Sequence, residues 1–157
     1  MKIKLICIGK TDAEYLKQGI AVYEKRLTHY TGFEIIEIPD IRNSKNMSEA
    51  QQKEAEGKKI LDLINNTDKL VLLDEKGKEF TSEKFASFFE KQLLQSIRSL
   101  VFVIGGPYGF SQELYERAGE KLALSQMTFS HQMIRLFFVE QVYRAHTIMK
   151  GEPYHHR

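Results

Sequence analysis

The sequence is poor in cysteine and has no tryptophan: Cys7 is the single cysteine among 157 residues. One thiol excludes an intrachain disulfide and a metal site built from cysteines, and it favours the cytoplasm as the default location. Because Cys7 stands in an apolar run, we expect it to pack as a small hydrophobe. The chain also has no run of 18 apolar residues and no basic-then-apolar leader, so we expect neither a membrane span nor export.

Several motifs that identify large enzyme classes are absent as well. The chain contains no G-x-x-x-x-G-K-[ST], no G-x-S-x-G and no H-E-x-x-H, and Pro107 stands where G-x-G-x-x-G would need its second glycine. P-loop, serine-hydrolase and zinc-protease functions therefore lose their support. The five histidines are scattered apart from His155 and His156, and no carboxylate cluster stands beside that pair. We therefore expect no metal site.

The residues that are present describe an ordinary globular chain. With 42% hydrophobic and 28% charged residues, residues 1–157 suffice for a single domain with a substantial core. Segments of helical periodicity alternate with apolar runs at residues 2–9, 33–39, 70–74, 100–104 and 122–124. This alternation predicts an α/β fold, with one parallel-type sheet of five strands and helices on both faces. The formal net charge of +2 neither identifies nor excludes a nucleic-acid binder.

Capping and turn residues mark the expected element boundaries. Capping boxes are predicted at residues 11–14 and 48–51, and Thr81 or Ser82 is expected to cap a later helix. A polar turn is expected at residues 75–78, after the strand at 70–74. Asp74 at that strand's end is either a catalytic or ribose-binding acid or a side chain that bonds the turn backbone, and the sequence leaves both open.

Two loops are expected to form a ligand crevice. The buried strand at 100–104 leads into the glycine-rich sequence GGPYG at residues 105–109, where the backbone can come close to a ligand. The short apolar run at 122–124 leads into SQMTF at residues 125–129, which combines a polar backbone with two large apolar side chains. Such loops at neighbouring strand ends predict a crevice with apolar walls and free peptide groups.

A long helix of about twenty residues is predicted between the N-cap Ser130 and the C′ residue Gly151. The residues expected to face the sheet are Ile134, Phe137, Phe138, Val142, Ala145, Ile148 and Met149. A second apolar side consists of Leu136, Val139 and Tyr143 among the polar residues Gln132, Arg135, His146 and Lys150. This second side predicts a second neighbour, either another subunit or the chain's own loops.

Two polar segments have the composition of RNA-binding surfaces. The carboxyl-terminal segment at residues 153–157 gathers an aromatic ring, two imidazoles and a guanidinium, which suit base stacking and phosphate binding. The alternative is a frayed terminus. The loop at residues 40–47 either meets phosphates or is a solvated connection.

Together these motifs resemble the RlmH family of SPOUT methyltransferases over essentially the whole chain. The resemblance is carried by LD at residues 73–74, IGGPYG at 104–109, LSQMTF at 124–129, His131, Arg135, YRA at 143–145 and PYH at 153–155. It implies that S-adenosylmethionine donates a methyl group to N3 of a pseudouridine in a stem-loop of large-subunit ribosomal RNA. It also implies a homodimer and a trefoil knot in the carboxyl-terminal part of the fold, neither of which composition or periodicity predicts.

The resemblance also assigns residues. It implies that the cofactor is bound by Leu73, Gly105, Leu124, Ser125, Gln126, Met127, Thr128 and Phe129. Our hypothesis for catalysis is that Tyr154, His155 and Arg157 place the base and stabilise its developing charge beside the crevice, of the same subunit or its partner, with His155 as a candidate base. The family usually has a basic residue directly after Pro-Tyr-His, whereas here His156 intervenes.

Two other functions share most of these features. A ribosome-associated RNA-binding module without catalysis would have the same fold and basic tail, but it would not bind S-adenosylmethionine. A methyltransferase of the same fold that acts on transfer RNA would bind the cofactor equally well. Cofactor binding separates the first from an enzyme, and mapping of the methylated nucleotide separates the second.

Overall fold

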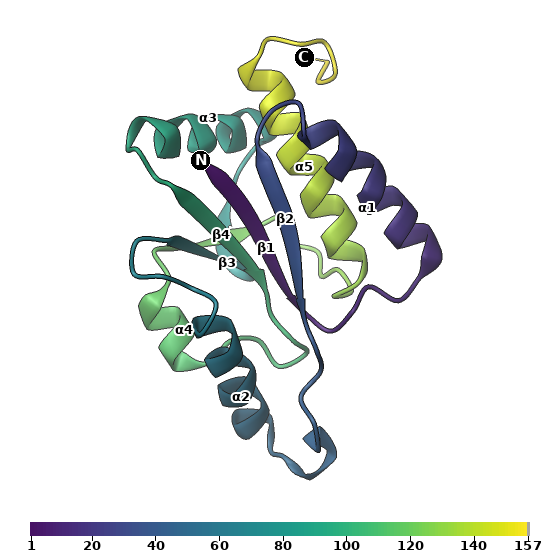
Figure 1. Ribbon diagram of the computed structural model, residues 1–157, viewed down its shortest axis with the longest axis vertical. Coiled ribbons are helices and arrows are strands. Elements are labelled where there is room, and N and C mark those ends of the chain that lie inside the picture. Colours follow the sequence, from purple (N-terminus) through teal and green to yellow (C-terminus); the bar gives the residue numbers. More distant parts are fainter. Residues whose placement is uncertain (157) are drawn as a thin grey trace.

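A parallel five-stranded sheet forms the centre of the computed structural model, which describes residues 1–156 (Figure 1). The strands are β1 (Lys2–Ile8), β2 (Gly32–Ile38), β3 (Lys69–Glu79), β4 (Ser99–Ile104) and β5 (Glu120–Ala123), in the spatial order β2-β1-β4-β3-β5. Every neighbouring pair is parallel, so all the carboxyl ends meet at one edge. The predicted α/β fold with five strands is confirmed.

Helices cover both faces of this sheet, as predicted. They are α1 (Glu14–Leu27), α2 (Glu49–Leu61), α3 (Ser82–Leu94), α4 (Gln112–Arg117) and α5 (Met133–Met149), with a short 3₁₀ helix η1 (Ser44–Asn46). One core cluster joins α1, α3 and α5 to one face, and a second joins α2 and α4 to the other. None of the helices in residues 1–156 is both long and apolar enough to cross a membrane.

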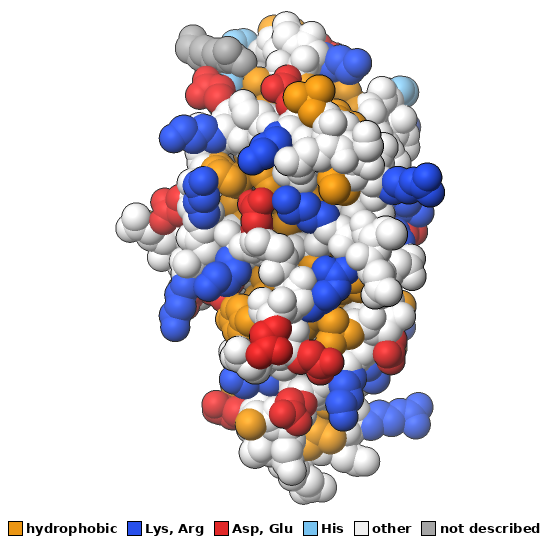
Figure 2. Space-filling model, turned by 90° about the vertical axis from the view of Figure 1, so that its left-hand side faces the viewer, with side chains coloured by type: hydrophobic (Ala, Val, Ile, Leu, Met, Phe, Trp, Pro, Cys, Tyr) orange, Lys and Arg blue, Asp and Glu red, His pale blue; other side chains and the backbone are white. Residues whose placement is uncertain are grey.

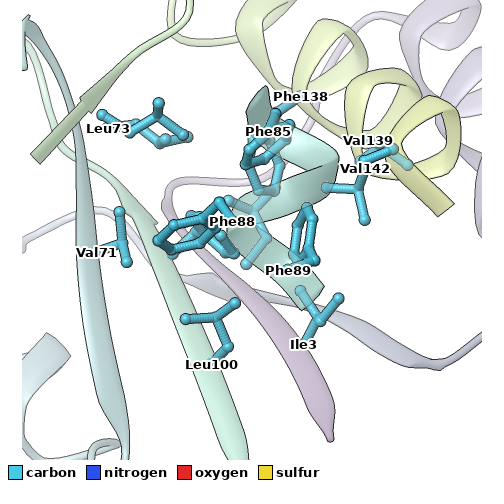
Figure 3. Close-up of a cluster of buried hydrophobic side chains, with 14 of the residues drawn as sticks. Ile3, Val71, Leu73, Phe85, Phe88, Phe89, Leu100, Phe138, Val139 and Val142 are labelled. Carbon is cyan, nitrogen blue, oxygen red and sulfur yellow. The ribbon is translucent and has the colours of Figure 1, made fainter. Parts of the chain in front are cut away.

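The larger core is built around phenylalanine rings from three elements. Phe85 and Phe89 of α3 lie with ring centroids 4.7 Å apart, and both rings point into the cluster shown in Figure 3. The ring of Phe102 of β4 lies 4.8 Å from that of Phe138 of α5. Phe89, Phe102 and Phe138 have no exposed surface. Such rings contribute much of the apolar area that a small core can bury, so this cluster fixes α5 on the sheet.

The turn predicted at residues 75–78 is wrong, because β3 continues to Glu79. After a shift in register, Lys78 pairs with Leu122 and Glu79 with Ala123 of β5. A Cβ atom on Gly77 would lie 2.7 Å from the backbone of β5. The glycine thus permits the two backbones to approach closely. The pairing of residues 78 and 79 with β5 keeps this segment in the strand, although its composition is typical of a turn.

Only some of the predicted helix caps are present. Ser48 and Gln51 form the expected capping box of α2, and the Thr81 side chain accepts a hydrogen bond from Lys84 N at 3.1 Å. The capping box at residues 11–14 is wrong: α1 begins after Ala13, whose side chain makes no capping bond. The Thr11 hydroxyl instead accepts a hydrogen bond from Arg135.

The burial of Arg135 explains why the Thr11 hydroxyl bonds to it rather than capping α1. The sequence placed it on a polar side of the long helix, but it is 1% exposed. Its guanidinium donates to the carbonyl oxygens of Ile8 and Gly9, both at 2.9 Å, and lies 3.4 Å from Glu37 Oε2. A buried arginine needs several acceptors, and the carboxyl end of β1 provides them.

Helix α5 is shorter than predicted, and the prediction of its core face is only partly confirmed: Phe138, Val142 and Ala145 are buried. The helix begins at Met133, although the Ser130 hydroxyl does accept the Met133 amide at 3.0 Å. Val139 and His146 of the predicted second side are buried in the core, whereas Phe137 of the predicted core side is 44% exposed. The predicted second neighbour is the chain's own α1, because α5 packs between α1 and α3. The trefoil knot stays a prediction.

Candidate active site

A pocket of about 490 Å³ lies at the carboxyl ends of β3, β4 and β5. Its walls come mainly from residues 73–76 within β3, from residues 104–110 at and after the end of β4, and from residues 122–125 and 127–129 at and after the end of β5. Glu49 of α2, Tyr115 of α4, and His131 and Ile134 at the start of α5 complete the lining. The sequence therefore located the pocket correctly, at the two loops that follow β4 and β5.

The glycine-rich turn after β4 forms one wall. Gly105 has no space for a side chain, because a Cβ atom would lie 2.9 Å from the Phe110 ring. The Gly109 amide donates to the Gly106 carbonyl at 3.2 Å, which closes the turn. Tyr108 stands beyond the turn and is 43% exposed. The wall near Gly105 is thus formed by backbone, with peptide groups close to any bound ligand.

The loop after β5 forms the facing wall. The Ser125 hydroxyl accepts a hydrogen bond from Met127 N at 3.0 Å, and the Thr128 hydroxyl donates to Glu75 Oε2 at 2.8 Å. The second bond ties this loop to β3. Met127 is 79% exposed, whereas the Phe129 ring packs 5.0 Å from the Phe137 ring. The loop therefore presents both apolar side chains and hydrogen-bonded hydroxyl groups to the pocket.

Both carboxylate oxygens of Asp74 are bonded within the protein. Oδ1 accepts a hydrogen bond from Lys76 N at 2.9 Å, and Oδ2 accepts one from the Tyr115 hydroxyl at 2.6 Å. Burial and this hydrogen bond raise the pKa of Tyr115 to about 12, so its phenol stays protonated. Of the two explanations left open for Asp74, the contacts support a side chain that bonds the backbone.

The structure brings together most of the residues assigned to the cofactor. Those that line the pocket are Leu73, Gly105, Leu124, Ser125, Met127, Thr128 and Phe129. Gln126 does not line it. Sequence reasoning missed Glu49 and Tyr115, because they reach the pocket from helices on the α2–α4 face and no local pattern marks them. Glu75 was missed because its segment was interpreted as a turn.

Tyr154 and His155 of the carboxyl-terminal segment pack against α5, contrary to the frayed-terminus alternative. The Tyr154 hydroxyl donates to Glu140 Oε1 at 2.9 Å, and the Tyr154 ring lies 4.8 Å from the Tyr143 ring. Burial, together with hydrogen bonds to Tyr23 and Glu140, raises the pKa of Tyr154 well above its ordinary range. Tyr154 is therefore a protonated donor.

Arg144 determines the tautomer of His155 in this arrangement. Arg144 Nη2 donates to Glu140 Oε1 at 2.6 Å, and Nη1 lies 3.1 Å from His155 Nδ1. Arginine has no acceptor, so His155 Nδ1 must accept and the imidazole proton must reside on Nε2. That Nε2 lies 3.8 Å from Glu83 Oε1.

The pocket and the tail lie at opposite ends of α5. His131 and Ile134 line the pocket at the start of the helix, whereas the tail follows its last residue, Met149. A helix of 17 residues is about 25 Å long at 1.5 Å per residue, and Figure 1 shows the tail beyond the amino ends of the strands. One chain therefore does not bring Tyr154 and His155 to its own pocket. Arg157 lies outside the described residues.

Other chemistries find no support in residues 1–156. No group of three or more histidine, cysteine, aspartate or glutamate side chains in this part of the chain could hold a metal ion. Burial raises the pKa of Cys7 to about 12, which confirms that this thiol is packed rather than reactive. The pocket itself suits a ligand with a flat apolar group and polar edges, since apolar side chains face backbone groups across it.

Comparison with known proteins agrees with this geometry. Residues 1–155 match the family model described as "Predicted SPOUT methyltransferase". The chain is 62% identical over 156 residues, and 99% of each chain, to a Parabacteroides distasonis protein named "Ribosomal RNA large subunit methyltransferase H". A protein of the same name from Christiangramia forsetii is 57% identical over 157 residues, 100% of each chain. Another from Bacteroides fragilis is 50% identical over 156 residues, 99% of each chain.

Proposed function

This chain belongs to the SPOUT methyltransferase family, and from that membership and the strand-end pocket we propose that it methylates large-subunit ribosomal RNA. The proposed reaction transfers the methyl group of S-adenosylmethionine to N3 of a pseudouridine in a stem-loop of that RNA, in the cytoplasm. The observation that carries the proposal is the pocket, whose walls are built by the motifs that the resemblance assigns to the cofactor.

The residues of the pocket fit S-adenosylmethionine. Leu124, Phe129 and Ile134 offer apolar surface for the adenine ring, and the peptide groups beside Gly105 can bond its edge. The cavity of about 490 Å³ lies in the range of small-molecule sites. The Glu75–Thr128 hydrogen bond ties the loop after β5 to β3 within the pocket lining.

Bound S-adenosylmethionine would supply a methyl group that is already electrophilic because its sulfur is a sulfonium. The protein then has to hold the acceptor nitrogen in line with that methyl group and to assist loss of the N3 proton. No metal ion is required for either task. These are demands on position and hydrogen bonding, which polar side chains can meet.

We assign those tasks to the tail. With its proton on Nε2, His155 can donate a hydrogen bond to a carbonyl oxygen of the base and so stabilise the developing imide charge. His155 Nδ1 becomes available as a proton acceptor only when Arg144 releases it. The Tyr154 ring offers a surface on which the base can stack. Arg157 is proposed to add positive charge.

Because the tail and the pocket of one chain are separated by the length of α5, we propose a homodimer in which each tail serves the partner's pocket. Large apolar side chains that are exposed on α1, α5 and the pocket loop support such an interface: Tyr15 at 63%, Val22 at 46%, Met127 at 79% and Phe137 at 44%. Burying them against a second copy would remove apolar surface from water.

Calorimetric titration with S-adenosylmethionine tests the proposal first. An enzyme should bind the donor and methylate ribosomes from a strain that lacks the methyltransferase, with the new mass on one large-subunit pseudouridine. Absence of binding would favour the non-catalytic module. Binding combined with methylation of transfer RNA would favour the second alternative. Mass mapping of the RNA distinguishes these results.

A further inference from the structure

An aromatic cluster with a cation at its centre lies far from the pocket, where α1 and α5 end beside the tail. Tyr23 of α1 lies 5.8 Å from Tyr143 of α5, and Tyr143 lies 4.8 Å from Tyr154 (centroid distances). The guanidinium carbon of Arg26 lies 5.3 Å from the Tyr23 centroid and 5.5 Å from the Tyr143 centroid. Arg26 is thus held by two rings next to the proposed catalytic tail.

Arg26 is an exposed residue, and no hydrogen bond of its side chain is found in the part of the chain that the structure describes. Within residues 1–156 it has no ion pair either. Two arginines of α5 differ in this respect. Arg144 is bonded to Glu140 and His155, and Arg135 is bonded to carbonyl oxygens and a carboxylate. Arg26 therefore has donors available for a ligand.

The rings restrict how such a ligand can be bound. A guanidinium near tyrosine faces is attracted by their π-systems, and this contact reduces the motion of a long side chain. Its N–H edge remains free to donate two parallel hydrogen bonds, which matches the spacing of two oxygens of a phosphate. A carboxylate has the same spacing, but the proposed substrate is RNA and presents phosphates.

The rest of the surface makes this group stand out. The net charge is only +2, and Figure 2 shows lysine and arginine side chains interspersed with acidic ones on the face it displays. A mixed surface of this kind attracts RNA weakly. Binding then depends on a few well-placed cations rather than on a continuous basic patch.

We propose that Arg26, held between Tyr23 and Tyr143, binds a backbone phosphate of the RNA close to the target nucleotide. The inference rests on the proposed function, because the tail that contacts this cluster is proposed to act at the methylated base. Arg26 then positions the RNA and does not take part in methyl transfer.

The test compares Arg26→Ala and Arg26→Lys with Lys25→Ala. Lys25 is a matched control, because it is also exposed and also lies in the last turn of α1, but it contacts no ring. For each protein one measures the Michaelis constant for ribosomes from a strain lacking the methyltransferase, the dissociation constant for S-adenosylmethionine, and the salt dependence of binding to those ribosomes.

Arg26→Ala should raise the Michaelis constant for ribosomes roughly tenfold and leave cofactor affinity unchanged, and its salt dependence should be less steep by about 0.7–0.9 in log–log slope. Arg26→Lys should lie between this variant and the wild type, because lysine keeps the charge but lacks the planar fork. Lys25→Ala should change each quantity less than twofold.

Equal effects of Arg26→Ala and Lys25→Ala would overturn the inference, and so would dissociation of a dimer by Arg26→Lys in sedimentation. If the wild-type protein binds the ribosomes without methylating them, the proposed function fails separately. The salt dependence of the two alanine variants then still decides the role of Arg26.

Discussion

The pocket and the tail cluster differ in what holds them together. The pocket is shaped by backbone: Gly105 admits no side chain, and the opposite loop is tied to β3 by the Thr128–Glu75 hydrogen bond. The tail is held by side chains, with Tyr154 and Arg144 meeting on one oxygen of Glu140. The proposed cofactor pocket and the proposed catalytic tail should therefore respond differently to mutation, and they lie at opposite ends of α5.

Because of this separation, one chain alone does not bring the two parts of the proposed site together. Helix α5 connects the two regions and keeps them apart by about 25 Å, given its 17 residues. A second copy that presents its tail to the first copy's pocket would bring the proposed catalytic residues close to the cofactor pocket. Holding reacting groups together can remove a large part of a catalytic barrier. Variants that change one region without the other separate the two proposed roles.

Removal of residues 153–157 should have the largest effect. Methyl transfer should fall at least roughly 100-fold, because the groups proposed to stabilise the developing charge are lost. The dissociation constant for S-adenosylmethionine, measured by calorimetry, should stay within twofold. His156→Ala serves as the control, since that side chain is exposed. Retained activity in the truncated protein would remove the tail from the mechanism.

Gly105→Val should damage the pocket and spare the tail. A Cβ atom at this position would lie 2.9 Å from the Phe110 ring, so the turn must move away from its place. Cofactor affinity should fall at least tenfold in the same calorimetric assay. Gln126→Ala is the control, because Gln126 does not line the pocket. A loss of affinity in the control of the same size would show that the described lining is incomplete.

Thr128→Val should have a moderate effect. Valine keeps the volume of threonine but cannot donate to Glu75, so the loop after β5 loses its bond to β3. We expect cofactor affinity to fall a few-fold and the cofactor to dissociate faster in stopped-flow measurements. Ser125→Ala would show whether a hydrogen bond within one wall matters as much as one that ties the loop to β3.

Tyr115→Phe should have the smallest effect, seen as a change in pH dependence. The pKa of Tyr115 is raised to about 12 from 10, so its stabilising contribution is complete below pH 10 and is lost as the pH rises through 12. The free energy of unfolding of the variant should therefore be slightly lower at pH 8 and fall less steeply between pH 10 and 12. Urea titrations at each pH measure this difference. Parallel curves for the two proteins would contradict it.

Local patterns predicted the fold and the pocket well, and long-range contacts explain the errors. Strand runs and the loops at 105–109 and 125–129 are contiguous in sequence, so their periodicity and composition suffice. Arg135 was misplaced because its acceptors, Ile8 and Gly9, lie 127 and 126 residues away. Asp74 is bonded by Tyr115, 41 residues further on. Periodicity on one helix cannot reveal such partners.

The tail is the clearest case of a partial prediction. Composition predicted that the side chains of Tyr154 and His155 suit base stacking and proton transfer, and this prediction does not depend on where the residues lie. Composition contains no information on distance, so it placed them beside the pocket without specifying whose pocket. The length of α5 separates the tail from the pocket of the same chain, and this separation is why we propose a second chain.

A mixed dimer tests the central claim most directly. One chain would carry Gly105→Val, the other would lack residues 153–157, and the two would be co-expressed with different tags and purified as a pair. If each tail serves the partner's pocket, the mixed dimer holds one complete site and should methylate ribosomes at about half the wild-type rate, while both parent variants are inactive. A mixed dimer as inactive as its parents would contradict the account.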